Sequence, residues 1–334
     1  MKLHSKSTLF LALVTLALGT ILTACEPHQL QVFKEAISTQ TKNAIDVLPA
    51  DAAYVGMVNM QDLKSNEYTN FFGQNGLLKS NAPQEGLARL QDFIDITGFD
   101  PDTDLKEVYV ASAEVGPDEK PAVSMVAYAS IEQEELQSYV EDRLDGELKT
   151  STYRGVEIFE VEEGNAPGFS FVNNNMIIAA TSTQLLEEMI DRLEGKGTSL
   201  SSNDEMMALI GRASSGESGW LVAQKPEGMQ FKSSSAGDDM EQSVRRIWSA
   251  LDQVVVAMNV EASGVEGEVF FYPTADVSAD DLSSLMNGMI ALAKASPELD
   301  EEGLDMLDQI RASSKGDHVS VDISVDNTMI EKLK

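Results

Sequence analysis

Three aspartates at alternate positions in the segment GFDPDTDL could place carboxylates around a metal ion. Asp100, Asp102 and Asp104 match the start of a calcium loop, which then needs a glycine at about the sixth position and a bidentate glutamate at about the twelfth. The chain has Leu105 and Ala111 at those positions. We therefore interpret the segment as a turn leading into a strand and keep the three aspartates only as weak metal candidates.

The chain has few histidines with which to build a metal site or an acid–base pair. Beyond the N-terminal segment there are two histidines, His28 near the single cysteine and His318 at the start of a predicted strand. A histidine metal cluster or a histidine-centred acid–base pair needs more partners than these. The segment GKGTS at 195–199 lacks the upstream glycine of a phosphate loop. We expect no enzymatic activity and no cofactor, and an enzyme using two facing carboxylates is the least favoured alternative.

The only cysteine of the chain, Cys25, could carry a lipid. It follows an uncharged segment at 7–24 that is too short and too close to the N-terminus for an ordinary spanning helix, which is typical of a signal peptide. Leu22, Thr23 and Ala24 match the lipobox of bacterial lipoproteins, in which small residues admit the signal peptidase and the cysteine thiol takes a diacylglycerol. An uncleaved membrane anchor, or a secretory signal with an accidental cysteine, are the alternatives.

Acylation of Cys25 would decide where the protein resides. A cysteine with a covalent diacylglycerol and an N-acyl lipid holds a protein on a membrane, since stable anchoring takes about two lipid signals. Glu26 follows, where an aspartate is the familiar signal for retention in the inner membrane. We therefore expect a lipid-anchored protein of the cell envelope, on the outer membrane facing the periplasm, with surface exposure as the alternative. With a single cysteine, packing rather than disulfides must hold the body.

The net charge of the chain excludes some classes of binding partner. Its 334 residues include 24 Lys and Arg against 55 Asp and Glu, a formal net charge of −31 at pH 7. This balance argues against binding nucleic acid or anionic lipid surfaces and is typical of a solvated acidic surface. Without the predicted signal peptide, the remaining length suits about two domains.

The elements that must position these residues alternate between short apolar strands and amphipathic helices. FSFV and MIIAAT form a predicted hairpin across the three asparagines at 173–175. A helix follows with one apolar stripe, formed by Leu185, Leu186, Met189, Ile190 and Leu193.

The order of elements repeats along the chain. GWLVAQKP stands where AYVGMVNM stands in the first half, and GEVFFYPT stands where AVSMVAYA does. We predict a signal peptide at 1–24, a tether at 25–44, a first α+β module at 45–200 and a second, abbreviated α+β module at 201–334. The predicted fold class is α+β, a tandem repeat of antiparallel or mixed β-sheets backed by amphipathic helices on one face. A coincidental order of elements is the alternative.

Three segments carry a family resemblance: LPADAAYVGMV, GFDPDTDL and FVNNNMIIAATSTQLLEEMIDRL, which together reach across most of residues 46–195. The chain resembles the bacterial domain-of-unknown-function 3352 family of exported and membrane-tethered proteins. The resemblance implies the architecture, and it brings no activity and no catalytic residues.

The favoured function is a non-catalytic envelope lipoprotein that presents a surface to another envelope protein or to cell-wall polymer. A periplasmic carrier or sensor of a hydrophobic ligand is the alternative, because a sheet covered by apolar helices can open a cavity between its layers.

Overall fold

The computed structural model of the chain describes residues 37–64, 104–113, 122–130, 148–161, 168–173, 175–214, 218–225, 238–261, 263–295, 304 and 307–326. The predicted signal peptide, Cys25 with Leu22, Thr23 and Ala24 before it, and the metal candidates Asp100 and Asp102 lie outside these residues. Within the described ranges, no helix has the length and apolar character needed to cross a membrane.

The strands that the structure describes belong to one antiparallel sheet of twelve strands. The predicted tandem repeat of separate sheets is therefore wrong. Alternation of apolar and polar residues fixes which face of a strand is buried, but it leaves open which strands share a sheet. Contacts along the chain define two compact units, one formed by Lys34–Met207 and the other containing Ala208–Lys334. We call them the N-terminal unit and the C-terminal unit.

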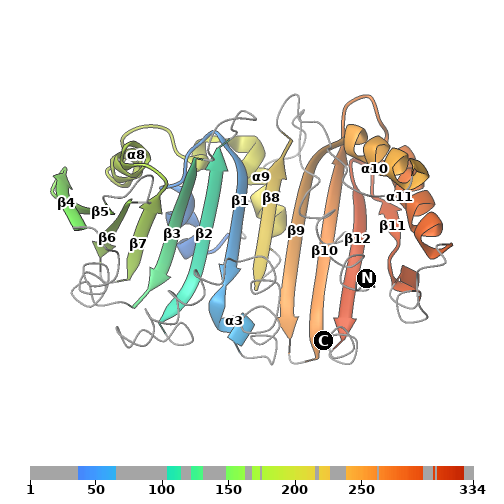
Figure 1. Ribbon diagram of the computed structural model, residues 1–334, viewed down its shortest axis with the longest axis horizontal. Coiled ribbons are helices and arrows are strands. Elements are labelled where there is room, and N and C mark those ends of the chain that lie inside the picture. Colours follow the sequence, from blue (N-terminus) through green and yellow to red (C-terminus); the bar gives the residue numbers. More distant parts are fainter. Residues whose placement is uncertain are drawn as a thin grey trace, which may run out of the picture. The chain divides into compact units, whose positions relative to one another are not determined.

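The N-terminal unit contains seven of the described strands, in the spatial order β4-β5-β6-β7-β3-β2-β1. Figure 1 shows them side by side, from green β4 to blue β1. They are β1 (Ala52–Asn59), β2 (Leu105–Ala113), β3 (Val123–Ala129), β4 (Leu148–Tyr153), β5 (Val156–Val161), β6 (Gly168–Asn173) and β7 (Met176–Ala180). The helices described in this unit are α2 (Thr39–Ile45), α3 (Met60–Lys64), α8 (Thr183–Leu193) and the 3-10 turn η1 (Leu200–Ser202).

The core of the N-terminal unit lies on the sheet face that carries Tyr109, Val126 and Ile178, each fully buried. Cross-strand register places these three residues opposite one another on β2, β3 and β7. Helix α8 begins at the cap Ser182, whose side chain accepts the N–H of Leu185. The predicted hairpin is confirmed as β6–β7, and the predicted stripe of α8 is confirmed by three buried residues, Leu186, Met189 and Ile190.

The C-terminal unit contains the strand order β8-β9-β10-β12-β11. Its strands are β8 (Gly219–Gln224), β9 (Leu251–Glu261), β10 (Gly264–Pro273), β11 (Ala312–Ser314) and β12 (Val319–Asp326). Helix α9 (Asp204–Ala213) leads into this unit, which also holds α10 (Asp238–Ala250) and α11 (Ala279–Lys294). Helix α11 packs on β10, β11 and β12, and its residues Leu282, Met286 and Ile290 are buried.

Candidate functional site

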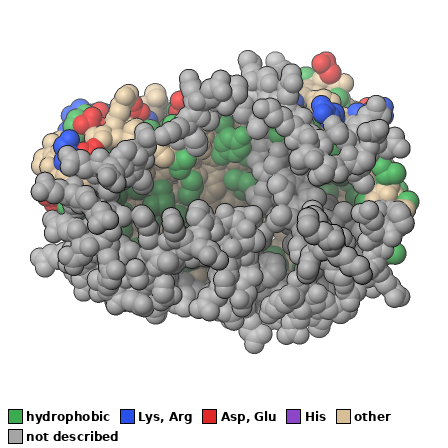
Figure 2. Space-filling view, viewed as in Figure 1, with side chains coloured by type: hydrophobic (Ala, Val, Ile, Leu, Met, Phe, Trp, Pro, Cys, Tyr) green, Lys and Arg blue, Asp and Glu red, His purple; other side chains and the backbone are tan. Residues whose placement is uncertain are grey.

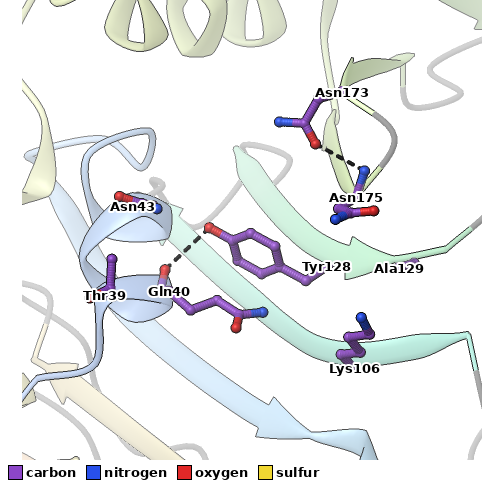
Figure 3. Close-up of a pocket in the computed structure, with 8 residues that line it drawn as sticks. All are labelled: Thr39, Gln40, Asn43, Lys106, Tyr128, Ala129, Asn173 and Asn175. Carbon is purple, nitrogen blue, oxygen red and sulfur yellow. Dashed lines mark hydrogen bonds between the residues drawn. The ribbon is translucent and has the colours of Figure 1, made fainter.

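A pocket of about 430 Å³ opens on the N-terminal unit, lined by residues of α2, β2, β3 and the β6–β7 hairpin. This volume is within the range of roughly 300–1,000 Å³ that is usual for ligand-binding pockets. Seven of its eight lining residues carry a polar side chain: Thr39, Gln40, Asn43, Lys106, Tyr128, Asn173 and Asn175, with Ala129 as the eighth. In Figure 3 the residues of α2 lie on one side of the Tyr128 ring and the two hairpin asparagines on the other.

Helix α2 presents three of these residues because its other side is buried. The helix begins at Ser38, whose hydroxyl accepts the backbone N–H of Thr41 at 3.0 Å. The side that faces the core is formed by Thr41, Ala44 and Ile45. Since residues three or four positions apart share one face of a helix, the lining residues Gln40 and Asn43 lie together on the other side.

Tyr128 joins this helix to the sheet at the centre of the pocket. Its hydroxyl donates to the backbone carbonyl of Gln40 over 3.2 Å, and its ring meets that of Tyr109 edge-on, with the ring centroids 6.1 Å apart. Burial, followed by the negative charge of Glu107, raises the pKa of Tyr128 to about 12. The phenol is therefore protonated at neutral pH and acts as a hydrogen-bond donor.

A second tyrosine holds α2 in place from below the pocket. The Tyr109 hydroxyl lies 2.9 Å from Thr41 Oγ1 and donates to Glu107 Oε2 at 2.5 Å. Thr41 Oγ1 in turn lies 2.8 Å from Ser38 Oγ. Burial raises the pKa of Tyr109 well above its usual range, and the hydrogen bond to Glu107 acts in the same direction. The Tyr109 hydroxyl therefore stays protonated at neutral pH, and the hydrogen-bonded chain of hydroxyl groups from β2 to the start of α2 keeps its donor.

The hairpin tip and β2 complete the lining. Asn173 Oδ1 accepts the backbone N–H of Asn175 at 2.9 Å, and Figure 3 shows its amide nitrogen turned the opposite way. The carbonyl of Asn175 accepts the N–H of Ala129 at 3.2 Å, which ties the tip to β3. Lys106 is exposed and lies where the pairing of β2 with β3 shifts register, an irregularity that can redirect a side chain.

Of the three aspartate candidates, the structure describes Asp104, which is half-buried just before β2. Its backbone carbonyl accepts the N–H of Ser130 at 2.9 Å. In the part of the chain that the structure describes, no group of three His, Cys, Asp or Glu residues could hold a metal ion. Whether Asp104 has metal-binding partners in Asp100 and Asp102 lies outside the described residues.

His318 has more neighbours than its sequence position indicated. Its Nδ1 lies 2.7 Å from Asp317 Oδ1 and 3.2 Å from Nη1 of Arg212 on α9. The Arg212 guanidinium lies over the rings of Phe270 and Tyr272, and it donates to the Tyr272 hydroxyl. Burial raises the pKa of Tyr272, and the charge of Arg212 opposes this shift. The cluster fastens α9 onto β10, so we assign it a packing role.

Charged side chains of both signs gather over α8, as Figure 2 shows at the upper left. Arg154, in the turn between β4 and β5, pairs with Asp191 and lies 3.6 Å from Glu194. Arg192 pairs with Glu188 at 3.3 Å within the helix. Partly exposed pairs such as those of Arg154 contribute little, about 0–1 kcal/mol each. The Arg192 side chain is largely buried and also donates to the backbone carbonyls of Val47 and Thr198, so we assign it a packing role.

Sequence reasoning missed most of the pocket. It noted the asparagines at 173–175 as turn residues and assigned residues 38–44 to a tether. The available signal was the uncharged polar segment STQT at 38–41, which stands out in an acidic chain and is followed two residues later by the apolar pair Ala44 and Ile45.

Comparison with known proteins gives a family and three structures of one distant protein. The family model described as "Protein of unknown function (DUF3352)" matches residues 10–314. Crystal forms I, III and IV of the protein TP0453 align at 9%, 9% and 10% identity, with TM-scores of 0.46, 0.49 and 0.47. The alignments cover 87%, 87% and 91% of this chain and 95%, 96% and 99% of that protein. No curated protein matches the chain.

Proposed function

Because the chain belongs to the DUF3352 family, whose description assigns no activity, we propose a function from its own pocket. The protein is a non-catalytic binding module, anchored in the cell envelope by a lipid on Cys25, and the pocket of the N-terminal unit is its ligand-binding site. The observation that carries the proposal is the set of seven polar side chains that converge on one cavity.

The chemistry of the lining supports binding rather than catalysis. Amides, hydroxyls and one ammonium hold ligands through hydrogen bonds. A general acid or base works best with a pKa near the operating pH, whereas burial raises the pKa of Tyr128 to about 12. Tyr128 therefore contributes a hydrogen bond that already connects β3 to α2.

The same lining favours a polar ligand over the hydrophobic ligand of the carrier alternative. Pockets for apolar molecules are lined mainly by hydrophobic and aromatic side chains, with a few polar groups for orientation. Here seven of the eight lining residues carry a polar group in the side chain, Ala129 is the single aliphatic one and Tyr128 the single aromatic one. An acyl chain in this pocket would strip water from amides and hydroxyls without replacing their hydrogen bonds.

The direct test places a photo-crosslinking amino acid with a slender aliphatic diazirine side chain, which leaves room for a ligand, at position 43 of the full-length protein in intact cells. The control places it at position 42, the next residue of α2, which is exposed and does not line the pocket. We expect an ultraviolet-dependent adduct with an envelope component from position 43 and little from position 42. No adduct from position 43, or equal adducts from both positions, would overturn the proposal.

A further inference from the structure

We propose that the pocket of the N-terminal unit is a glycan-binding site and that it prefers sugars bearing a carboxylate. This inference rests on the proposed function, because it names the ligand class of the same site. Its support comes from the type of hydrogen-bonding group in the lining, the fixed positions of those groups, and the charge at one end.

The four amide side chains of the lining suit a sugar. Gln40 and Asn43 come from α2, and Asn173 and Asn175 come from the β6–β7 hairpin. A primary amide offers two donors and an acceptor in one plane, while each sugar hydroxyl both donates and accepts. Neighbouring hydroxyls of a pyranose can therefore bond to one amide at the same time. Amides on two sides of the cavity can hold two edges of the same ring.

The elements that carry these amides are held before any ligand arrives. Tyr128 fixes the backbone of Gln40 at 3.2 Å, and the start of α2 is bonded through Thr41 to Tyr109 at 2.9 Å. On the other side, the bond of 2.9 Å between Asn173 Oδ1 and the Asn175 N–H fixes the hairpin tip. Binding to side chains on a backbone that is already ordered costs less conformational entropy, which matters for a ligand held mainly by hydrogen bonds.

Charge distinguishes acidic from neutral sugars. Lys106 contributes an ammonium to the lining, and none of the eight lining residues has a carboxylate. Glu107, the nearest acid in the sequence, acts on Tyr128 through its charge, but it accepts the hydroxyl of Tyr109 at 2.5 Å and is not one of the lining residues. In a chain with a net charge of −31, a pocket with this lining is a local exception that favours an anionic substituent.

The geometry disfavours a peptide that adds as a strand. Strand addition needs free backbone groups at a sheet edge. At the pocket end of β3, the N–H of Ala129 donates to Asn175 at 3.2 Å and the N–H of Ser130 donates to Asp104 at 2.9 Å. A peptide strand therefore finds no free N–H at these two positions, whereas a sugar can bind through the side chains of the lining.

The test measures binding by titration calorimetry at low salt, with the full-length protein in mild detergent. The probes are trigalacturonic acid as an acidic glycan, chitotriose as a neutral glycan and tri-alanine as a peptide. We expect trigalacturonic acid to bind more tightly than chitotriose and tri-alanine not to bind. Asn43→Trp, which fills the pocket, should abolish binding of both sugars.

The charged contact is tested with Lys106→Gln. We expect this substitution to weaken the binding of trigalacturonic acid by roughly fivefold, the effect of losing one partly exposed ion pair. The affinity for chitotriose should stay unchanged. The control is Lys149→Gln, which removes the same charge from an exposed position on β4. This variant should bind both sugars as the unaltered protein does.

The remaining outcomes overturn the inference. If neither sugar binds while position 43 still crosslinks in cells, the glycan assignment is wrong and the proposed binding function stands. Binding of tri-alanine that Asn43→Trp abolishes would assign the pocket to peptides. Sugar binding that survives Asn43→Trp would place the site elsewhere. If Lys106→Gln lowers the affinity for both sugars equally, the pocket has no preference for carboxylates.

Discussion

Tyr128 gives the pocket a hydrogen-bond donor whose protonation depends on the fold. Burial raises its pKa to about 12, above the value of about 10 for an unfolded tyrosine. Below pH 10 the phenol is neutral in both states, and the hydrogen bond to Gln40 is fully present. As the pH rises from 10 to 12, the unfolded state loses its proton first, so the free energy of unfolding must fall.

We therefore expect stability, measured by urea unfolding, to decrease between pH 10 and pH 12. Tyr128→Phe removes one of the titrating groups and should make this decrease shallower, while Tyr109 and Tyr272 still contribute. An identical pH dependence in both proteins would contradict the assignment of a raised pKa to Tyr128.

Two glycines of the C-terminal unit lie in opposite surroundings. A Cβ on Gly264 of β10 would collide with the backbone carbonyl of Val325 on β12, whereas a Cβ on Gly288 of α11 would meet nothing within 4 Å. Gly264→Ala should lower the free energy of unfolding by about 1–3 kcal/mol. Gly288→Ala should raise it by about 0.5–1 kcal/mol, because alanine favours the helix. Denaturant melts check both, and equal effects would refute the close approach of β10 and β12.

Single residues also show where the sequence stops being informative. Tyr109 and Tyr128 read as ordinary strand residues, because their partners Thr41 and Gln40 stand 68 and 88 positions away. The asparagines at 173–175 were recognisable as a turn from their type alone. Their part in a pocket depends on α2, which no local pattern connects to them.

At the scale of elements, α2 is the part of the site that is easiest to disturb. It has seven residues, and Ser38 caps it by accepting the N–H of Thr41 at 3.0 Å. Ser38→Ala should cost about 1 kcal/mol of stability and reduce the crosslink yield from position 43. Ser182→Ala removes the corresponding cap of α8 and should cost a similar amount without affecting the crosslink. Equal crosslink yields in the two variants would show that α2 does not position the site.

Elements were predictable where the pattern was local. The stripe of α8, the β6–β7 hairpin and the strand predicted to start at His318, which is β12, all follow from periodicity and turn residues. The segment at 38–44 was assigned to a tether because its apolar positions are sparse. Its burial depends on Tyr109 of β2, and contact with a strand so distant in sequence leaves no periodic signal.

At the scale of the whole molecule, the family resemblance read from the sequence is confirmed by a match over residues 10–314. The tandem sheets were wrong, since a repeated order of elements does not decide whether each repeat closes its own sheet. Pairing between strands is a long-range property, and register and edges are set by tertiary packing.

Anchoring by Cys25 stays a prediction at this scale, and one substitution tests it. Cys25→Ala removes the thiol that the lipobox would acylate, so incorporation of a labelled fatty acid should be lost. The protein should then leave the outer-membrane fraction, either released or retained with its signal peptide. Unchanged labelling and fractionation would contradict a lipid at this position.

The central claim, that the pocket holds a ligand in the cell envelope, is tested most directly by the reactivity of Lys106. An amine-reactive label would be applied to intact envelopes and to the purified protein, and its incorporation at each lysine read by mass spectrometry. We expect Lys106 to be protected in envelopes and exposed Lys149 to react equally in both samples, and we expect Asn43→Trp to remove the difference between envelope and purified samples at Lys106. Equal labelling of Lys106 in both samples of the unaltered protein would contradict the central claim.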